Sequence, residues 1–113
     1  MEDKEGDFVR NLIEGYAEIE KKLGYEPDFH DDHVEKVIIT SDRVEFELKT
    51  ESGVLYSLIF EDVKDINLKA EILGTVGIIY ELEIKQVEGM LNTAIESSLG
   101  LYGDIISKRI IVR

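Results

Sequence analysis

The densest cluster of side chains that could do chemistry is His30-Asp31-Asp32-His33. Imidazole and carboxylate groups are common metal ligands. In an extended segment, however, neighbouring side chains point to opposite sides, so at most two of these four share a face. The chain has only two histidines, and a complete site would need further donors from elsewhere. We therefore predict no metal site here, and expect Asp31 or Asp32 to cap the backbone of a turn.

The remaining polar residues form no pattern typical of an enzyme. General acid–base catalysis requires two groups held at different pKa values in a cleft. The pair Glu45 and Glu47 alternates with apolar residues, as does the pair Glu81 and Glu83, which is typical of the wet face of a sheet. Ser97 is not in a Gly-x-Ser-x-Gly elbow, and the chain has no cysteine. The sequence thus predicts no catalytic residue, no cofactor and no enzymatic activity.

Length and charge limit the classes of protein further. A chain of 113 residues has room for one domain, expected to span residues 1–113. The net charge of -12 repels phosphate backbones and anionic lipid, so we expect neither nucleic-acid nor membrane binding. The same charge attracts a basic protein partner, although acidity also serves solubility alone. The lack of cysteine and the acidic first residues favour a cytoplasmic location.

A helix is expected at about residues 7–23. Phe8, Leu12, Tyr16, Ile19 and Leu23 recur at helical spacing and lie on one face. Asp7 is a suitable N-cap, and Gly24 can adopt the left-handed conformation that ends a helix. Gly15, inside the pattern, either weakens the helix or marks a close packing contact.

After Pro27 the apolar period changes from 3.6 to 2, which is typical of strands. No gap between the runs holds a second convincing helix, so parallel βαβ units are not expected. The sequence predicts an α+β fold: the N-terminal helix, then about seven mostly antiparallel strands at about 33–113, in a curled sheet or a two-layer sandwich. The expected strands are residues 34–40, 44–49, 54–60, 66–72, 78–84, 90–97 and 105–112.

A partner-binding site is predicted from local acid density and from aromatic residues in turns. Tyr25 and Tyr102 are expected to be partly exposed, and tyrosine supplies a large contact area in interfaces. Phe29 is expected instead to fill the junction between helix and sheet. The acids of the helix exit complete the predicted site: Asp28, Asp31, Asp32 and Glu35.

Three short motifs resemble the bacterial immunity-protein family numbered fifty, over residues 28–113. The first is an F-H-D phrase before the first strand, the second approximates F-x-x-V-x-x-L with a longer final spacing, and the third is a closing G-x-x-G…I-x-V. This resemblance implies an antitoxin that binds and blocks a cognate toxin, with no cofactor and no catalysis. The motif residues are Phe29, His30 and Asp31; Phe60, Val63 and Leu68; and Gly100, Gly103, Ile110 and Val112.

Three functions remain open from the sequence. The first is an inhibitor or immunity protein that binds a basic toxin domain by occlusion. The second is a small-ligand binder with a pocket between the sheet and the helix. The third is a self-associating domain, with a homodimer formed through an unpaired edge strand. A closed apolar pocket would favour the second function, whereas an acidic surface with exposed aromatic residues would favour the first.

Overall fold

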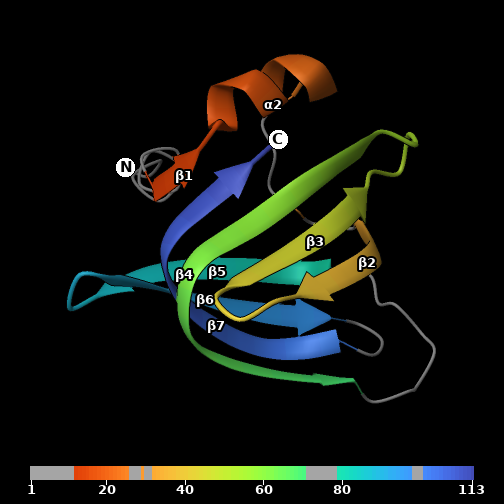
Figure 1. The fold of residues 1–113 in the computed structure, drawn as a ribbon. Coiled ribbons are helices and arrows are strands. Elements are labelled where there is room, and N and C mark those ends of the chain that lie inside the picture. Colours follow the sequence, from red (N-terminus) through yellow and green to blue (C-terminus); the bar gives the residue numbers. More distant parts are fainter. Residues whose placement is uncertain (1–11, 26–28, 30–31, 71–78, 98–100) are drawn as a thin grey trace.

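The computed structural model describes residues 12–25, 29, 32–70, 79–97 and 101–113. These residues form seven strands in one open sheet and one short helix (Figure 1). The prediction of mostly antiparallel strands is confirmed, but the described chain is mainly β, so the α+β class fits only loosely. The elements are β1 (Ile13–Glu14), α2 (Tyr16–Leu23), β2 (His33–Ile39), β3 (Arg43–Lys49), β4 (Leu55–Ala70), β5 (Ile79–Val87), β6 (Met90–Ser97) and β7 (Leu101–Val112).

The sheet has the order β2-β3-β4-β7-β6-β5, with β2 and β5 at its ends. β7 pairs along its whole length with β4 from Leu58 to Ala70, and both strands curve strongly, which curls the sheet (Figure 1). The other edge of β7 is shared by two strands. β6 pairs with it as far as Ser107, and β1 then pairs with Ile110 and Ile111 in parallel. The centre of the sheet is therefore built from pairings distant in sequence.

β4 is one strand of 16 residues, so the prediction of separate strands at 54–60 and 66–72 is wrong over the described residues. A β-bulge between Val63 and Asp65 shifts the register against β7, and Asp62 has a positive φ of 55°. The Val63 amide donates to the Asp42 carbonyl over 2.9 Å. A bulge bends a strand without ending it. The acids Glu61-Asp62, which resemble a turn in sequence, thus mark a bend.

The end of the predicted helix is confirmed and its start is wrong. Gly24 closes α2 in the left-handed conformation, and its amide donates to the Glu20 carbonyl. Ile13 and Glu14, placed in the helix by their spacing, instead form β1. Gly15 separates the two elements with a φ of 81°, and a Cβ there would lie 2.3 Å from the Val112 carbonyl oxygen. Gly15 is thus a close packing contact. The first part of the predicted helix, residues 7–11 with the expected N-cap Asp7, lies outside the described residues.

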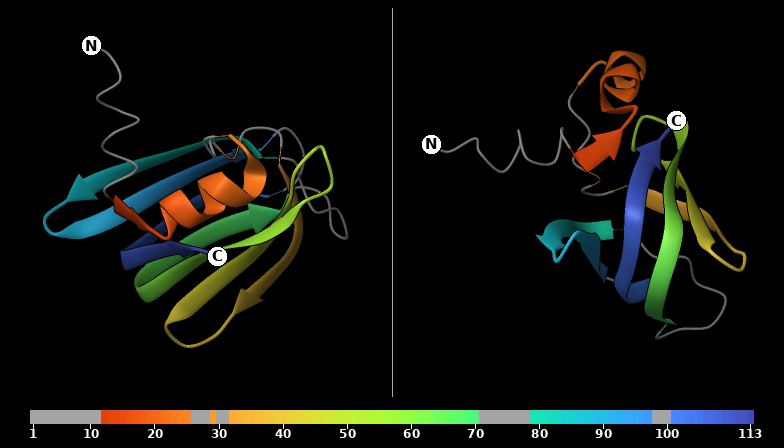
Figure 2. Two further views of the ribbon diagram at one scale, coloured as in Figure 1. Left: turned by 90° about the horizontal axis from the view of Figure 1, so that it is seen from above. Right: turned by 60° about the vertical axis from the view of Figure 1, so that its left-hand side comes forward.

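The apolar core lies on the inner, concave side of the sheet. Phe46 and Phe60 are fully buried and meet edge to face, with ring centroids 5.7 Å apart. Tyr16 and Ile19 of α2 belong to the same cluster. Views from two further directions show α2 lying over one end of the curled sheet (Figure 2). Phe29 is buried and stacks on Tyr56, as expected for a residue at the junction of helix and sheet.

Candidate protein-binding surface

Two rows of side chains cross the outer face of the sheet. The strand registers align Arg43, Glu61 and Arg109 across β3, β4 and β7. The next row on this face runs from Glu45 through Ile59 and Ile111 to Glu14. Directly opposed residues of paired strands point to the same face, so the rows form one surface. We call the five charged residues of these rows, Glu14, Arg43, Glu45, Glu61 and Arg109, the charged face.

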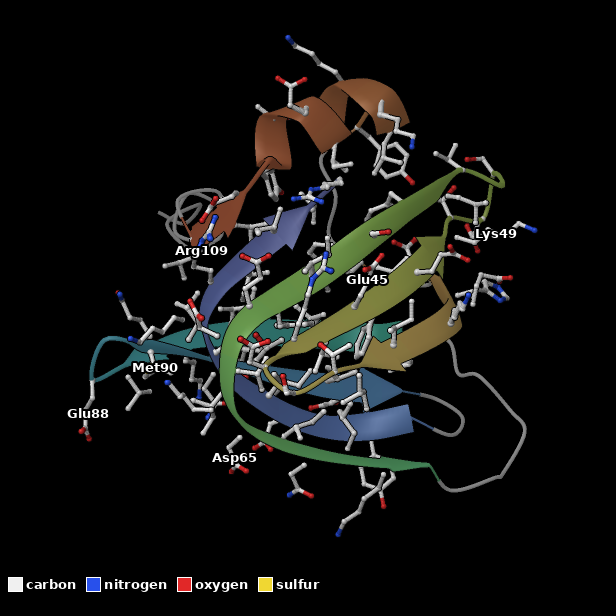
Figure 3. All side chains as sticks on the ribbon, in the orientation of Figure 1. Glu45, Lys49, Asp65, Glu88, Met90 and Arg109 are labelled. Carbon is white, nitrogen blue, oxygen red and sulfur yellow. The ribbon has the colours of Figure 1, made fainter. Side chains whose placement is uncertain are left out.

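Arg109 is the centre of the charged face. Its Nε and Nη2 donate to the two carboxylate oxygens of Glu14, both over 2.8 Å, and its Nη1 donates to Glu61 over 2.9 Å. Figure 3 places Arg109 beside β1 and Glu45 towards β3. A guanidinium matches a carboxylate in this paired geometry. The hydrogen bonds from Arg109 lower the pKa of Glu14, and Glu14 in turn raises the pKa of Arg109. Both groups are therefore charged at neutral pH.

An open, charged hollow lies at the β4 bulge. It has a volume of about 280 Å³ and is lined by Asp42, Arg43, Glu61, Asp62 and Arg109. Arg43 lies 3.5 Å from Glu45 and 4.0 Å from Glu61. Its Nε has no hydrogen-bond partner among the described residues. Together with Asp42 and Asp62 of its lining, the surface holds five acids against two arginines, so it favours cationic groups over anionic ones.

The charged face also covers apolar surface. Ile59 and Ile111 are buried but are not part of the inner core cluster. Both lie in the row between Glu45 and Glu14. Long charged side chains cover apolar neighbours with their methylene stems while their charges stay in water. The ion-paired side chains thus shield Ile59 and Ile111 from water and present an ordered set of charges.

The structure removes one residue from the predicted surface site. Asp32 is buried, and its carboxylate accepts a hydrogen bond from the hydroxyl of Tyr56, which is buried as well. The expectation that Asp32 forms part of an exposed acidic patch is wrong, because it is a polar contact inside the fold. Asp28 and Asp31, like the histidine between them, lie outside the described residues.

The other three predicted residues are exposed but do not form one surface. Tyr25 is 48% exposed and Tyr102 41% exposed, as expected. Tyr25 follows α2, which lies at the end of β7 that pairs with β1, whereas Tyr102 is at the opposite end of β7. Glu35 is exposed at a β-bulge in β2. These residues cannot contact one small partner epitope together, and their roles in binding stay predictions.

The charged face is not evident from the sequence, because the pairing of its members depends on strand register. The spacing of the apolar residues predicts a helix at Glu14, and Arg109 lies in a strand that also holds Asp104, Ser107 and Lys108. Nothing in the sequence alone marks Arg109 as the partner of Glu14, because Lys108 beside it carries the same charge. Within the described residues, no three metal-ligating side chains come together, and no helix is long and apolar enough to cross a membrane.

Comparisons with known proteins give a fold and no family. No protein-family model matches the chain, and neither does any curated protein. The chain is similar in structure to an uncharacterized protein from Neisseria gonorrhoeae, with a TM-score of 0.60 and 12% sequence identity. The match covers 75% of this chain and 92% of that protein. At this identity the likeness concerns the fold alone.

Proposed function

We propose that this protein binds a basic bacterial toxin domain and neutralises it by occlusion, as a cytoplasmic immunity protein. The observation that carries the proposal is the ordered, acid-rich outer surface on a chain of net charge -12. Carboxylates on a rigid sheet attract a basic partner over a long range and accelerate its association. A sheet face held by ion pairs also needs little rearrangement on binding, which lowers the cost of forming a complex.

The packing of α2 argues against the alternative function, the binding of a small ligand. That function requires a pocket between helix and sheet, but Tyr16 and Ile19 project from α2 into the core cluster and are 5% and 2% exposed. The hollow at the β4 bulge is open and lined by charged side chains, whereas small-molecule sites are mostly apolar and enclosed. Protein binding therefore has the better support among the described residues.

A test of the proposal starts from the neighbouring gene. We expect it to encode a secreted protein whose C-terminal domain is toxic when expressed in the cytoplasm. Co-expression of the present chain should restore growth, and the two purified proteins should form a stable complex. A neighbouring domain that is toxic but neither bound nor relieved by this chain would refute the proposal. A variant with Phe46→Ala, which removes core packing, is the control for rescue that requires the folded protein.

A further inference from the structure

β2 presents an open edge. It is the last strand on its side of the sheet, and among the described strands only β3 pairs with it. The Thr40 amide donates to the Arg43 carbonyl, which fixes the alternation of hydrogen bonds in this hairpin. In an antiparallel pair every second residue turns its N–H and C=O away from the partner strand. Counting back from Thr40, Ile39 and Val37 therefore turn these groups towards the open edge.

The side chains at the end of β2 suit strand pairing. Ile38 is 40% exposed and Ile39 57% exposed, although both are large and β-branched. Edge strands are normally protected by charges or bulges. β2 has a bulge between Val34 and Lys36, but from Val37 to Ile39 it has neither device. The unprotected part of the edge, from Val37 to Ile39, is thus short and lies beside the hairpin turn.

The opposite edge of the sheet is protected. In β5, exposed Glu83 and Lys85 flank the buried Ile84. Charged side chains on both sides of an apolar residue discourage a further strand, because pairing would desolvate them. Of the two strands that end the path of the sheet, β2 thus has the less protected edge over the described residues.

We propose that β2, from Val37 to Thr40, accepts an extended segment of a basic partner as an added antiparallel strand. This inference rests on the proposed function and adds a second contact beside the charged face, since Ile38 lies opposite Glu45. Backbone groups of Val37 and Ile39 supply the hydrogen bonds, and Ile38 and Ile39 supply apolar contacts. The net charge of -12 favours a segment rich in lysine or arginine over a second copy of this chain, which carries the same charge.

The first probe is a peptide of about ten alternating lysine and valine residues, at the upper end of usual strand lengths. Added to the full chain, it should slow hydrogen exchange at the amides of Val37 and Ile39. A matched peptide of alternating glutamate and valine should have a much weaker effect. Protection located at β5, or equal protection by both peptides, would overturn the proposal.

Two substitutions at one position separate the backbone from the side chain. Ile39→Pro removes the outward N–H without removing a β2–β3 hydrogen bond, and proline is tolerated on the open side of an edge strand. It should weaken peptide binding at least about tenfold, because roughly one hydrogen bond is lost and the hydrogen bonds next to it are disturbed. Ile39→Thr keeps the N–H and should retain most binding. Equal affinity of the proline variant and the unsubstituted chain, with both folded, would contradict strand addition.

The same variants distinguish this inference from the proposed function. If Ile39→Pro binds and neutralises the neighbouring toxin domain as well as the unsubstituted chain does, strand addition is wrong and the immunity function stands. If the lysine-rich peptide adds to β2 but no toxin domain is bound, the open edge is real and the immunity function is wrong. A dimer of the chain that Ile39→Pro dissociates would show that a second copy is the occupant, and would overturn the choice of a basic partner.

Discussion

The two faces of the central strands follow different rules. On the inner face Val44, Phe46 and Leu48 of β3 are almost completely buried, and they pack into one apolar cluster. On the outer face Arg43 and Glu45, from the same strand, form ion pairs at the surface. Apolar burial is the main source of stability, whereas exposed ion pairs contribute little. The inner face therefore fixes the fold, and the outer face can change its charges to suit a partner.

The largest expected effect on stability is at Phe46, and its neighbour Glu47 on the opposite face of β3 provides the comparison. Phe46→Ala removes a fully buried ring and its contact with Phe60. It should lower the free energy of unfolding by about 3–5 kcal/mol. Glu47→Ala, the next residue and half-buried on the outer face, should change it by about 0.5 kcal/mol or less. Urea unfolding followed by circular dichroism measures both; similar losses at the two positions would contradict the division of roles.

A smaller effect is expected at the junction of β1 and α2. Gly15 and Gly24 have nearly equal positive φ values, but a Cβ at Gly24 would meet nothing within 4 Å, whereas one at Gly15 would meet the Val112 carbonyl. Gly24→Ala should therefore show only the cost of the backbone conformation, about 1–2 kcal/mol. Gly15→Ala should lose clearly more, because β7 has to move. Equal losses in thermal or urea unfolding would show that the contact is unimportant.

The smallest effect on stability is expected on the charged face. Arg109→Gln removes the paired hydrogen bonds to Glu14 and one to Glu61. Because these groups are exposed, the loss of stability should be less than in either glycine variant, and it should shrink further in concentrated salt. Urea unfolding at low and high ionic strength measures this. A large loss that is independent of salt would mean that Arg109 belongs to the structural core.

The ion pair also predicts a pH dependence. The folded protein holds the pKa of Glu14 below its ordinary value of 4.5, so the folded state favours the charged carboxylate. The stabilisation is present above pH 4.5 and disappears as the pH falls through the lower pKa of the folded state. The stability difference between the unsubstituted protein and Arg109→Gln should thus be constant near neutral pH and vanish in acid. A difference that grows on acidification would be contrary to this account.

The sequence predicts the local features of this fold well. Gly24 ends the helix through its own backbone, and the alternating residues of β3 define a strand without reference to the rest of the chain. Pairing of β4 with β7 is not local, because it depends on how the whole sheet closes over the core. The charged face cannot be predicted from local patterns for the same reason, because its members Glu14 and Arg109 are 95 residues apart. The burial of Asp32 has a related cause, since its partner Tyr56 lies in β4, 24 residues further along the chain.

The most direct test of a protein-binding role is the salt dependence of association with the neighbouring toxin domain. The rate constant should be measured by stopped flow, at low and at physiological ionic strength, for the unsubstituted chain and for a variant with Asp42→Asn and Asp62→Asn. Both acids line the hollow, so the removal of their charges should slow association and flatten its salt dependence. An association rate that is independent of salt and of these two charges would contradict an acidic surface that recruits a basic partner.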